Sequence, residues 1–174
     1  RASKYLIPKF KGLLFYFVGG PVEVHSSLHN QVKSYRRLIH ELKLPSDRFI
    51  FLEKQPVKEV PLWLKASDLL LMPHPKTEFY SNHVSPLKMF EYMASKRPIV
   101  ASRLPAIEEI LTDNQNALLG EPGCPEDIAK NIETALINTE LSTRIASRAY
   151  TDVQEHTWEK RARRILNLIL AKGC

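Results

Sequence analysis

Cysteines, long apolar runs and targeting signals are scarce or missing in this sequence. The two cysteines, Cys124 and Cys174, lie far apart, so they provide neither a disulfide framework nor enough ligands for a zinc site. No apolar run reaches the roughly 18 residues that a membrane-spanning helix needs, and the chain does not open with the basic start and apolar centre of a signal peptide. We therefore expect a cytoplasmic protein, and leave open a peripheral contact with the inner face of the membrane.

Two further absences concern chemistry and chain length. The sequence contains no Asp-x-Asp metal-binding motif, and no pair of catalytic base and nucleophile stands out. We therefore expect no metal site. An initiator methionine is also missing, because the chain opens Arg1-Ala2-Ser3 and runs almost at once into a helix-like stretch. We expect the chain to be a fragment of a longer protein.

The residues that are present have the composition of an ordinary soluble domain. Apolar residues make up 44% of the 174 residues and charged residues 25%, which fits one folded domain without disordered or repetitive segments. The formal net charge is +6. A basic chain can bind nucleic acid, an anionic membrane surface or a phosphate-bearing small molecule, and the charge alone does not choose among them.

Strand-like and helix-like segments alternate along the first two thirds of the chain. Apolar runs predict buried strands at 12–18, 48–52, 68–72, 98–101 and 117–119. Helices are expected at 27–43, 61–66, 86–95, 106–111, 125–138, 140–154 and 158–171. The alternation predicts an α/β fold, a doubly wound Rossmann-like parallel sheet with helices on both faces, followed by a helical C-terminal third.

Ligands of such a sheet bind beyond the carboxyl ends of its strands, here at the loops 19–25, 53–57 and 73–85. The last of these is the longest and most polar. At its end Ser85 is a suitable N-cap and Pro86 a suitable first helical residue. The unpaired N–H groups of a helix start favour a bound phosphate, and Lys88 adds a full positive charge in the first turn.

Glu91 lies too deep inside this predicted helix to cap it. Its neighbours Phe90, Tyr92 and Met93 look packed, and a carboxylate among packed residues needs a partner. Two vicinal hydroxyls, such as those of a ribose, would be suitable donors to it. The alternative interpretation is a surface glutamate.

The segment from Ser85 to Leu111 resembles the C-terminal lobe of retaining GT-B glycosyltransferases, of the glycosyl transferases group 1 or family 4 type. Segments 15–21, 48–52 and 66–73 and the closing helices are similar in order and spacing to the same lobe, so the resemblance covers nearly all of residues 1–174. It implies a lobe that binds a nucleoside diphosphate sugar. In the full-length enzyme it implies transfer of the sugar to an acceptor hydroxyl with retention, as in polysaccharide biosynthesis.

The resemblance also implies roles for individual residues. In the family a Glu-x7-Glu pattern straddles the phosphate-binding helix start, where the second glutamate holds the ribose and the first contacts the transferred sugar. Glu91 matches the second position, whereas His83 stands at the first. A histidine there can still hydrogen-bond a sugar hydroxyl, and the alternative is a solvent-exposed loop histidine. The diphosphate is implied to bind at Ser85, Pro86, Leu87 and Lys88.

Earlier segments are implied to line the same site. Gly19 and Gly20 form a loop that faces the donor, where the absence of a Cβ permits close backbone approach, and an ordinary strand-ending turn is the alternative. Gln55 falls where the family lays the nucleotide base against backbone atoms, although the glycine common there is Glu53 here. His74 is a further loop histidine, for which a function is the less favoured interpretation.

The resemblance implies that an earlier strand with a diphosphate-binding arginine and lysine, and the N-terminal acceptor-binding lobe, lie outside this chain. Alone, the chain is expected to bind weakly and to transfer nothing. No cofactor is expected besides the donor, a UDP- or GDP-sugar, and no nucleic acid. Two alternatives stay open: a non-catalytic Rossmann-like module for nucleic acid or an anionic membrane, and a lobe of a GT-B nucleotide-sugar epimerase. The basic segment 160–164 is interpreted as a solvated helix face beside a partly exposed apolar stripe.

Overall fold

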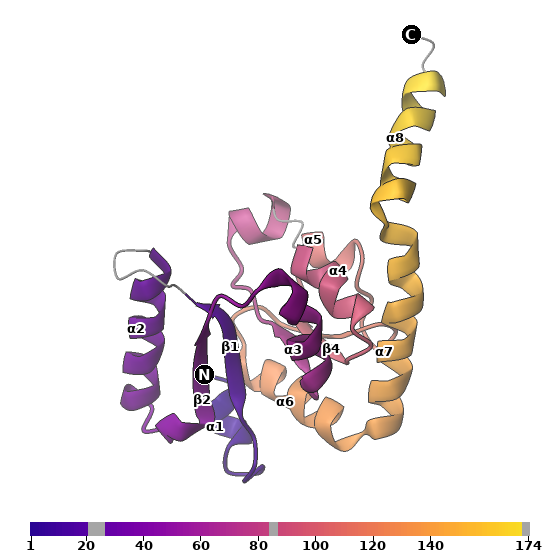
Figure 1. The fold of residues 1–174 in the computed structure, drawn as a ribbon. Helices are drawn as coiled ribbons and strands as arrows, with labels where there is room; N and C mark the ends of the chain where they lie inside the picture. The colour runs from indigo at the N-terminus through magenta and orange to yellow at the C-terminus, as the bar shows by residue number, and fades with distance from the viewer. Residues whose placement is uncertain (21–26, 84–86, 172–174) are drawn as a thin grey trace. The chain divides into compact units, whose positions relative to one another are not determined.

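The structure, a computed structural model, describes residues 1–20, 27–83 and 87–171, and within the middle range the side chains of residues 32–81. The chain divides into two compact units, Arg1–Trp63 and Leu64–Cys174. Both contain helices and parallel strands (Figure 1). The predicted α/β class is therefore confirmed.

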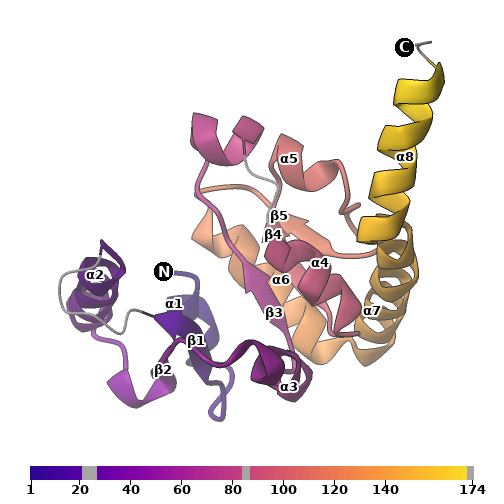
Figure 2. The ribbon, with the colours of Figure 1, turned by 45° about the horizontal axis from the view of Figure 1, so that its top comes forward.

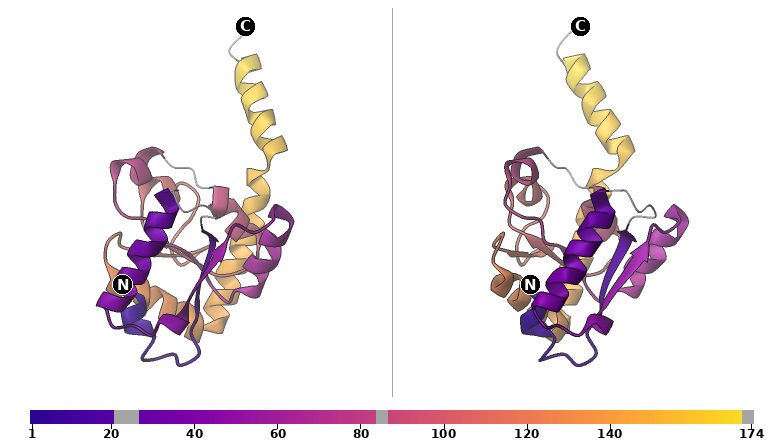
Figure 3. Two further views of the ribbon diagram at one scale, coloured as in Figure 1. Left: turned by 60° about the vertical axis from the view of Figure 1, so that its left-hand side comes forward. Right: turned by 90° about the vertical axis from the view of Figure 1, so that its left-hand side faces the viewer.

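The first unit is built on two parallel strands, β1 (Phe15–Gly20) and β2 (Phe49–Glu53). A short helix α1 (Ser3–Leu6) precedes them, and α2 (Ser27–Glu41) runs beside the strand pair (Figure 3). Aromatic rings stack across the pair, with 5.3 Å between the ring centroids of Phe15 and Phe49 and 4.7 Å between those of Phe17 and Phe51. These cross-strand contacts fix the register of the two strands.

The ends of β1 differ from the predicted strand 12–18. The strand starts later because the chain first makes a tight turn, in which the N–H of Leu13 donates to the carbonyl of Phe10 over 3.1 Å. It also continues through the two glycines, which the sequence analysis assigned to a loop. Gly20 still pairs with Glu53, while Gly19 forms a bulge with φ of 100°. Glycine adopts this backbone conformation without the steric cost that a Cβ would bring.

The second unit is built on three parallel strands in the order β3 (Leu70–Met72), β4 (Ile99–Ser102) and β5 (Leu118–Gly120). Figure 2 shows them with the helices that follow. These helices are α4 (Leu87–Ala94), α5 (Pro105–Glu108), α6 (Pro125–Ile137), α7 (Thr139–Val153) and α8 (Trp158–Ala171). Helix α6 packs along β4 and β5, and both α4 and α6 pack against α7. A short α3 (Val60–Ala66) spans the boundary between the units.

The apolar core of the second unit decides how α4 is oriented. Met89 and Met93 lie one turn apart on α4 and are both 0% exposed, in a cluster with Met72 and Ile99. Burying a side chain of this size stabilises the fold by roughly 1.5–3 kcal/mol. The opposite side of the helix, with Leu87, Lys88 and Glu91, is exposed, as the periodicity of an α-helix requires.

The closing helix α8 has no buried residue. Its apolar stripe, expected to be partly exposed, includes Ile165 at 49% and Leu166 at 58% exposure, and the basic residues Arg161, Arg163 and Arg164 are exposed as well. Figures 1 and 2 both show α8 extending beyond the helices that precede it in the second unit. Among the residues that the structure describes, no helix is long and apolar enough to cross a membrane.

Candidate functional site

The candidate site lies at the carboxyl ends of β3, β4 and β5. Because the three strands are parallel, their carboxyl ends meet at one edge of the sheet. A helix that returns the chain from one parallel strand to the next begins at this edge. The first turn of α4 and the loop after β3 therefore belong to it.

Lys88 and Glu91 share the exposed side of α4, three residues apart. Side chains at this spacing are neighbours on a helix surface. Neither forms an ion pair with any other described residue within 4.0 Å. An ammonium group that forms no ion pair can bind phosphate oxygens, and a carboxylate that forms none can accept hydrogen bonds from a ligand.

Glu91 corrects one step of the sequence analysis. Its side chain is exposed, so burial does not oblige the carboxylate to find a partner. The helix turns Met89 and Met93 into the core and thereby turns Glu91 outward. Burial raises the pKa of the next residue, Tyr92, and the negative charge of Glu91 raises it further. Glu91 forms no ion pair with the part of the chain that the structure describes, so its carboxylate is available as an acceptor.

The loop after β3 holds a histidine against a tyrosine. The backbone N–H of His74 donates to the carbonyl of Met72 over 3.1 Å, so the chain turns as soon as the strand ends. The rings of His74 and Tyr80 stack with 4.5 Å between centroids and 17° between planes. Tyr80 itself packs against the apolar core, and its N–H donates to Thr77 Oγ1 over 3.2 Å. The histidine ring is therefore held from one face.

The charge state of His74 depends on the same surroundings. Burial of the imidazole lowers its pKa, and the positive charge of Lys88 lowers it further. Met72 at the end of β3 and Met89 in the first turn of α4 share one buried cluster, so these two segments lie close together. Burial and the Lys88 charge both favour the neutral imidazole over the imidazolium.

Arg103 follows the last residue of β4 and is held by acidic groups on three sides. Its Nη2 lies 2.7 Å from Asp113 Oδ2, its Nη1 lies 3.1 Å from Glu108 Oε1, and its Nε lies 3.4 Å from Glu121 Oε1. The hydrogen bond to Asp113 is the largest cause of a raised pKa for Arg103. Because three carboxylates lie against the Arg103 guanidinium, this side chain holds the loops together, whereas Lys88 forms no ion pair with any residue that the structure describes.

Neither the histidine–tyrosine stack nor the Arg103 cluster was predicted from the sequence. Their positions just after predicted strands could have identified them, because Arg103 directly follows β4 and His74 lies two residues after β3. Residues at the carboxyl ends of parallel strands are the usual site residues of such sheets. Nothing local in the sequence, however, shows that Tyr80 or Asp113 folds back onto them.

The sequence-predicted residues of the second unit lie in or beside α4. Leu87 is its exposed first residue, followed by Lys88 and Glu91. His83 ends a π-helical turn, Phe79–His83, and its side chain is outside the described part of the chain. Ser85 and Pro86 also lie outside the described residues.

The sequence-predicted residues of the first unit lie at the ends of its strands. Gly19 and Gly20 close β1, and Gln55 follows β2. The side-chain amide of Gln55 donates to the carbonyl of Glu53 over 2.8 Å. This bond orders the turn after β2 and occupies one of its backbone acceptors.

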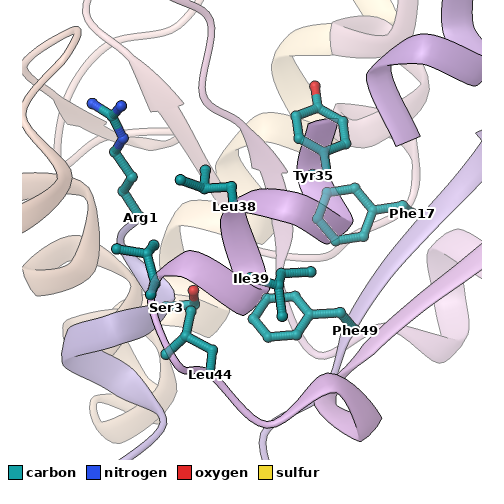
Figure 4. A pocket seen from close by; sticks show the side chains of 9 residues that line it. Arg1, Ser3, Phe17, Tyr35, Leu38, Ile39, Leu44 and Phe49 are labelled. Carbon is teal, nitrogen blue, oxygen red and sulfur yellow. The ribbon is translucent and has the colours of Figure 1, made fainter. Parts of the chain in front are cut away.

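A small cavity in the first unit is smaller than the pockets that usually bind small molecules. Its volume is about 70 Å³, and it is lined by Tyr35 and Ile39 of α2 and by Phe17 and Phe49 of the strands (Figure 4). Pockets for small-molecule ligands usually span roughly 300–1,000 Å³. No group of three or more His, Cys, Asp or Glu side chains in residues 1–20, 27–83 and 87–171 is arranged to hold a metal ion.

Comparison with known proteins defines the class. Residues 3–138 match the family of glycosyl transferases group 1, and the solved structures that resemble the chain are GT-B glycosyltransferases. The chain belongs to the glycosyl transferases group 1 family.

Individual relatives agree with this assignment. An uncharacterised glycosyltransferase from Methanocaldococcus jannaschii is 31% identical over 70 residues, which are 40% of this chain and 20% of the relative. HepE from Anabaena, crystallised with UDP-glucose, aligns with a TM-score of 0.72 at 23% identity over 88% of this chain and 39% of HepE. The C-terminal domain of a group 1 glycosyl transferase from Francisella tularensis, LpcC, aligns with a TM-score of 0.69 at 23% identity over 88% of this chain and 74% of that domain. The chain thus spans less than half the length of the first two.

Proposed function

We propose that this chain is the C-terminal, donor-binding lobe of a retaining glycosyltransferase of the family 4 type. The enzyme transfers a sugar from a nucleoside diphosphate sugar to an acceptor hydroxyl. The chain spans part of the length of its relatives, and the acceptor then binds to segments outside it. The likeness to a domain described as C-terminal supports this position in the enzyme.

The observation that carries the proposal is the exposed side of α4 at the carboxyl edge of the sheet. Lys88 offers a cation that no described carboxylate neutralises, and Glu91 offers an acceptor three residues away. A diphosphate followed by a ribose presents the complementary groups, two anions and a pair of vicinal hydroxyl donors. A nucleic acid presents phosphates too, but it gives the single carboxylate no comparable role and meets repulsion from it.

The proposed chemistry places the positive groups where charge develops. When the bond between the sugar and the diphosphate breaks, negative charge accumulates on the leaving diphosphate. A lysine and helix N–H groups that face this charge lower the barrier because they stabilise the transition state more than the bound donor. No cofactor besides the donor is part of the proposal, and the donor base, uracil or guanine, is left to experiment.

The direct test is an assay of the full-length protein with UDP-, GDP- and ADP-sugars. We expect one nucleotide class to bind and to be consumed when the acceptor is supplied, with the anomeric configuration retained in the product. Failure of every nucleotide sugar to bind the full-length protein would overturn the proposal. An inverted product would overturn the retaining mechanism alone.

The role of Glu91 has a sharper test. Two charge-assisted hydrogen bonds of roughly 1.5–3 kcal/mol each correspond to a loss of at least about a hundredfold in donor affinity. Glu91→Ala should show this loss with unchanged unfolding, because the side chain is exposed. Glu140→Gln, which changes an exposed glutamate on α7, is the matched control. Equal donor affinity in both variants would remove Glu91 from the site.

Peripheral membrane contact of the enzyme is a separate proposal, supported by the exposed cations Arg161, Arg163 and Arg164 on α8. Clusters of basic residues beside exposed apolar ones favour anionic lipid surfaces. Co-sedimentation of the full-length protein with vesicles that contain phosphatidylglycerol tests it. Equal recovery with neutral vesicles would contradict an electrostatic contact.

A further inference from the structure

His74, Tyr80 and Lys88 form a cluster that the proposed function uses only in part. Stacking on Tyr80, with 4.5 Å between ring centroids, covers one face of the imidazole and restrains its rotation. Among the described residues, none hydrogen-bonds the ring nitrogens of His74. Because ring N–H groups lie in the ring plane, stacking leaves them available to a ligand.

The position of the cluster matches the charge that the site is proposed to bind. His74 lies two residues after the carboxyl end of β3, and Lys88 lies in the first turn of α4. The Lys88 charge reaches His74 strongly enough to lower its pKa, although burial is the larger cause. An anion bound between the two groups would offset the repulsion that the Lys88 charge exerts on a protonated His74.

We propose that His74 is a second ligand of the donor diphosphate, which it holds together with Lys88 by donating a ring N–H to a phosphate oxygen. Tyr80 is a positioning residue that fixes the plane of the imidazole. The inference rests on the proposed function, since it adds a contact to the same donor site. It extends the site from α4 to the loop after β3.

The groups around His74 determine what binding does to its proton. Lys88 faces it from α4, and Tyr80 stacks on it from its own loop. Lys76 and Glu78 are the other charged residues of that loop, and both are exposed. Glu91 on α4 adds an exposed carboxylate. When the diphosphate binds beside Lys88, the added negative charge favours the imidazolium, so His74 takes up a proton from solvent.

Proton uptake gives the inference a measurable sign. A ligand that raises the pKa of a group binds more tightly at the pH where that group is protonated. Affinity for the donor should therefore be highest at low pH and should fall, by up to about tenfold per pH unit, as the pH rises between the pKa of free and of bound His74. At higher pH the affinity levels off at the value that Lys88, Glu91 and the neutral imidazole support.

The experiment is isothermal titration calorimetry of the full-length protein with UDP-glucose. Each phosphate of this probe carries one ester and one anhydride linkage. Neither phosphate therefore has the second ionisation that a phosphomonoester shows at about pH 6, and the ligand itself does not titrate in this range. GDP- and ADP-glucose replace it if the protein prefers another base. Measurement at pH 6 to 8, in buffers of different ionisation enthalpy, counts the protons that are taken up per donor bound.

The variants separate a ligand from a structural residue. His74→Gln should abolish proton uptake and weaken binding at least about tenfold at pH 6, with little change at pH 8. His40→Gln, which changes an exposed histidine of the first unit, should leave uptake unchanged. Tyr80→Leu should weaken binding at pH 6, and Tyr80→Phe, which keeps the ring, should restore it.

Each outcome decides between the two proposals. If the wild-type protein binds a nucleotide sugar without proton uptake, or if His74→Gln keeps the uptake, the role of His74 is wrong while the donor site stands. If no nucleotide sugar binds at any pH, both are wrong. Loss of uptake in His74→Gln alone, with binding retained at pH 8, supports the proposal.

Discussion

Asn116 offers the most quantitative test of how the segment between α5 and β5 is held. It is only 3% exposed and makes three hydrogen bonds. Its Oδ1 accepts from the N–H of Thr112 over 2.7 Å, and its Nδ2 donates to the carbonyl of Ile110 over 3.2 Å and to Asp152 Oδ2 over 2.9 Å. The last bond ties the segment after α5 to α7.

The expected cost of Asn116→Ala follows from these bonds. Each net hydrogen bond contributes about 1 kcal/mol, which gives about 3 kcal/mol for three. Asp152 keeps its ion pair with Arg148, whose Nε lies 2.8 Å from Oδ1. The variant therefore leaves no charge unpaired, and the loss of unfolding free energy should not rise far above this value. Exposed Gln115, one residue earlier, is the matched control.

Urea unfolding followed by circular dichroism measures both variants. Asn116→Ala should lower the unfolding free energy of the second unit by about 3 kcal/mol, whereas Gln115→Ala should stay within about 0.5 kcal/mol of the wild type. Equal stabilities would refute the reasoning, because they would mean that water replaces all three bonds without loss. A cost for Asn116→Ala with no cost for Gln115→Ala assigns the effect to the buried amide.

Four further predictions test other parts of the chain. Gly19→Ala should lower the unfolding free energy by about 1–2 kcal/mol, because φ is 100° there. Gly12→Ala should be tolerated, because its added Cβ meets nothing within 4 Å. Chemical denaturation compares the two variants. Met93→Ala should cost about 2–5 kcal/mol in the same assay, since it opens a cavity in the core, and a cost below about 1 kcal/mol would contradict its burial. Lys88→Gln should raise the pKa of His74 in an NMR titration. The rise should be less than half of the total lowering of this pKa, because burial is the larger cause. An unchanged pKa would show that the Lys88 charge does not act on His74. The folded-state pKa of His74 lies below 6.5, so the unfolded chain binds more protons than the folded chain. The unfolding free energy should therefore fall as the pH drops below 6.5. This part of the pH dependence should vanish in His74→Gln.

The elements of the second unit were largely predictable because their signals are local. Apolar spacing places helices within about two residues of the observed α4, α6 and α7. The short α5, Pro105–Glu108, ends earlier than the expected 106–111. Strand ends were predicted less well, since residues such as Gly20 join a strand only through a partner on another strand.

The candidate site was predictable where it lies on one helix. The spacing of Met89 and Met93 fixes the buried side of α4, so the same periodicity could have shown Glu91 to be exposed. Lys88 and Glu91 follow from the helix alone. The segments of the first unit belong to a separate compact unit, and the roles of Gly19, Gly20 and Gln55 stay predictions.

By itself, the sequence determined the alternation of strands and helices, a helix start of the kind that binds phosphate, and membership of a glycosyltransferase family. The tertiary structure decided which groups meet at that edge. It stacks His74 on Tyr80 beside Lys88 and closes three carboxylates around Arg103. Periodicity and capping depend on neighbours a few residues apart, whereas these contacts join different loops, and only the packing of the core brings such loops together.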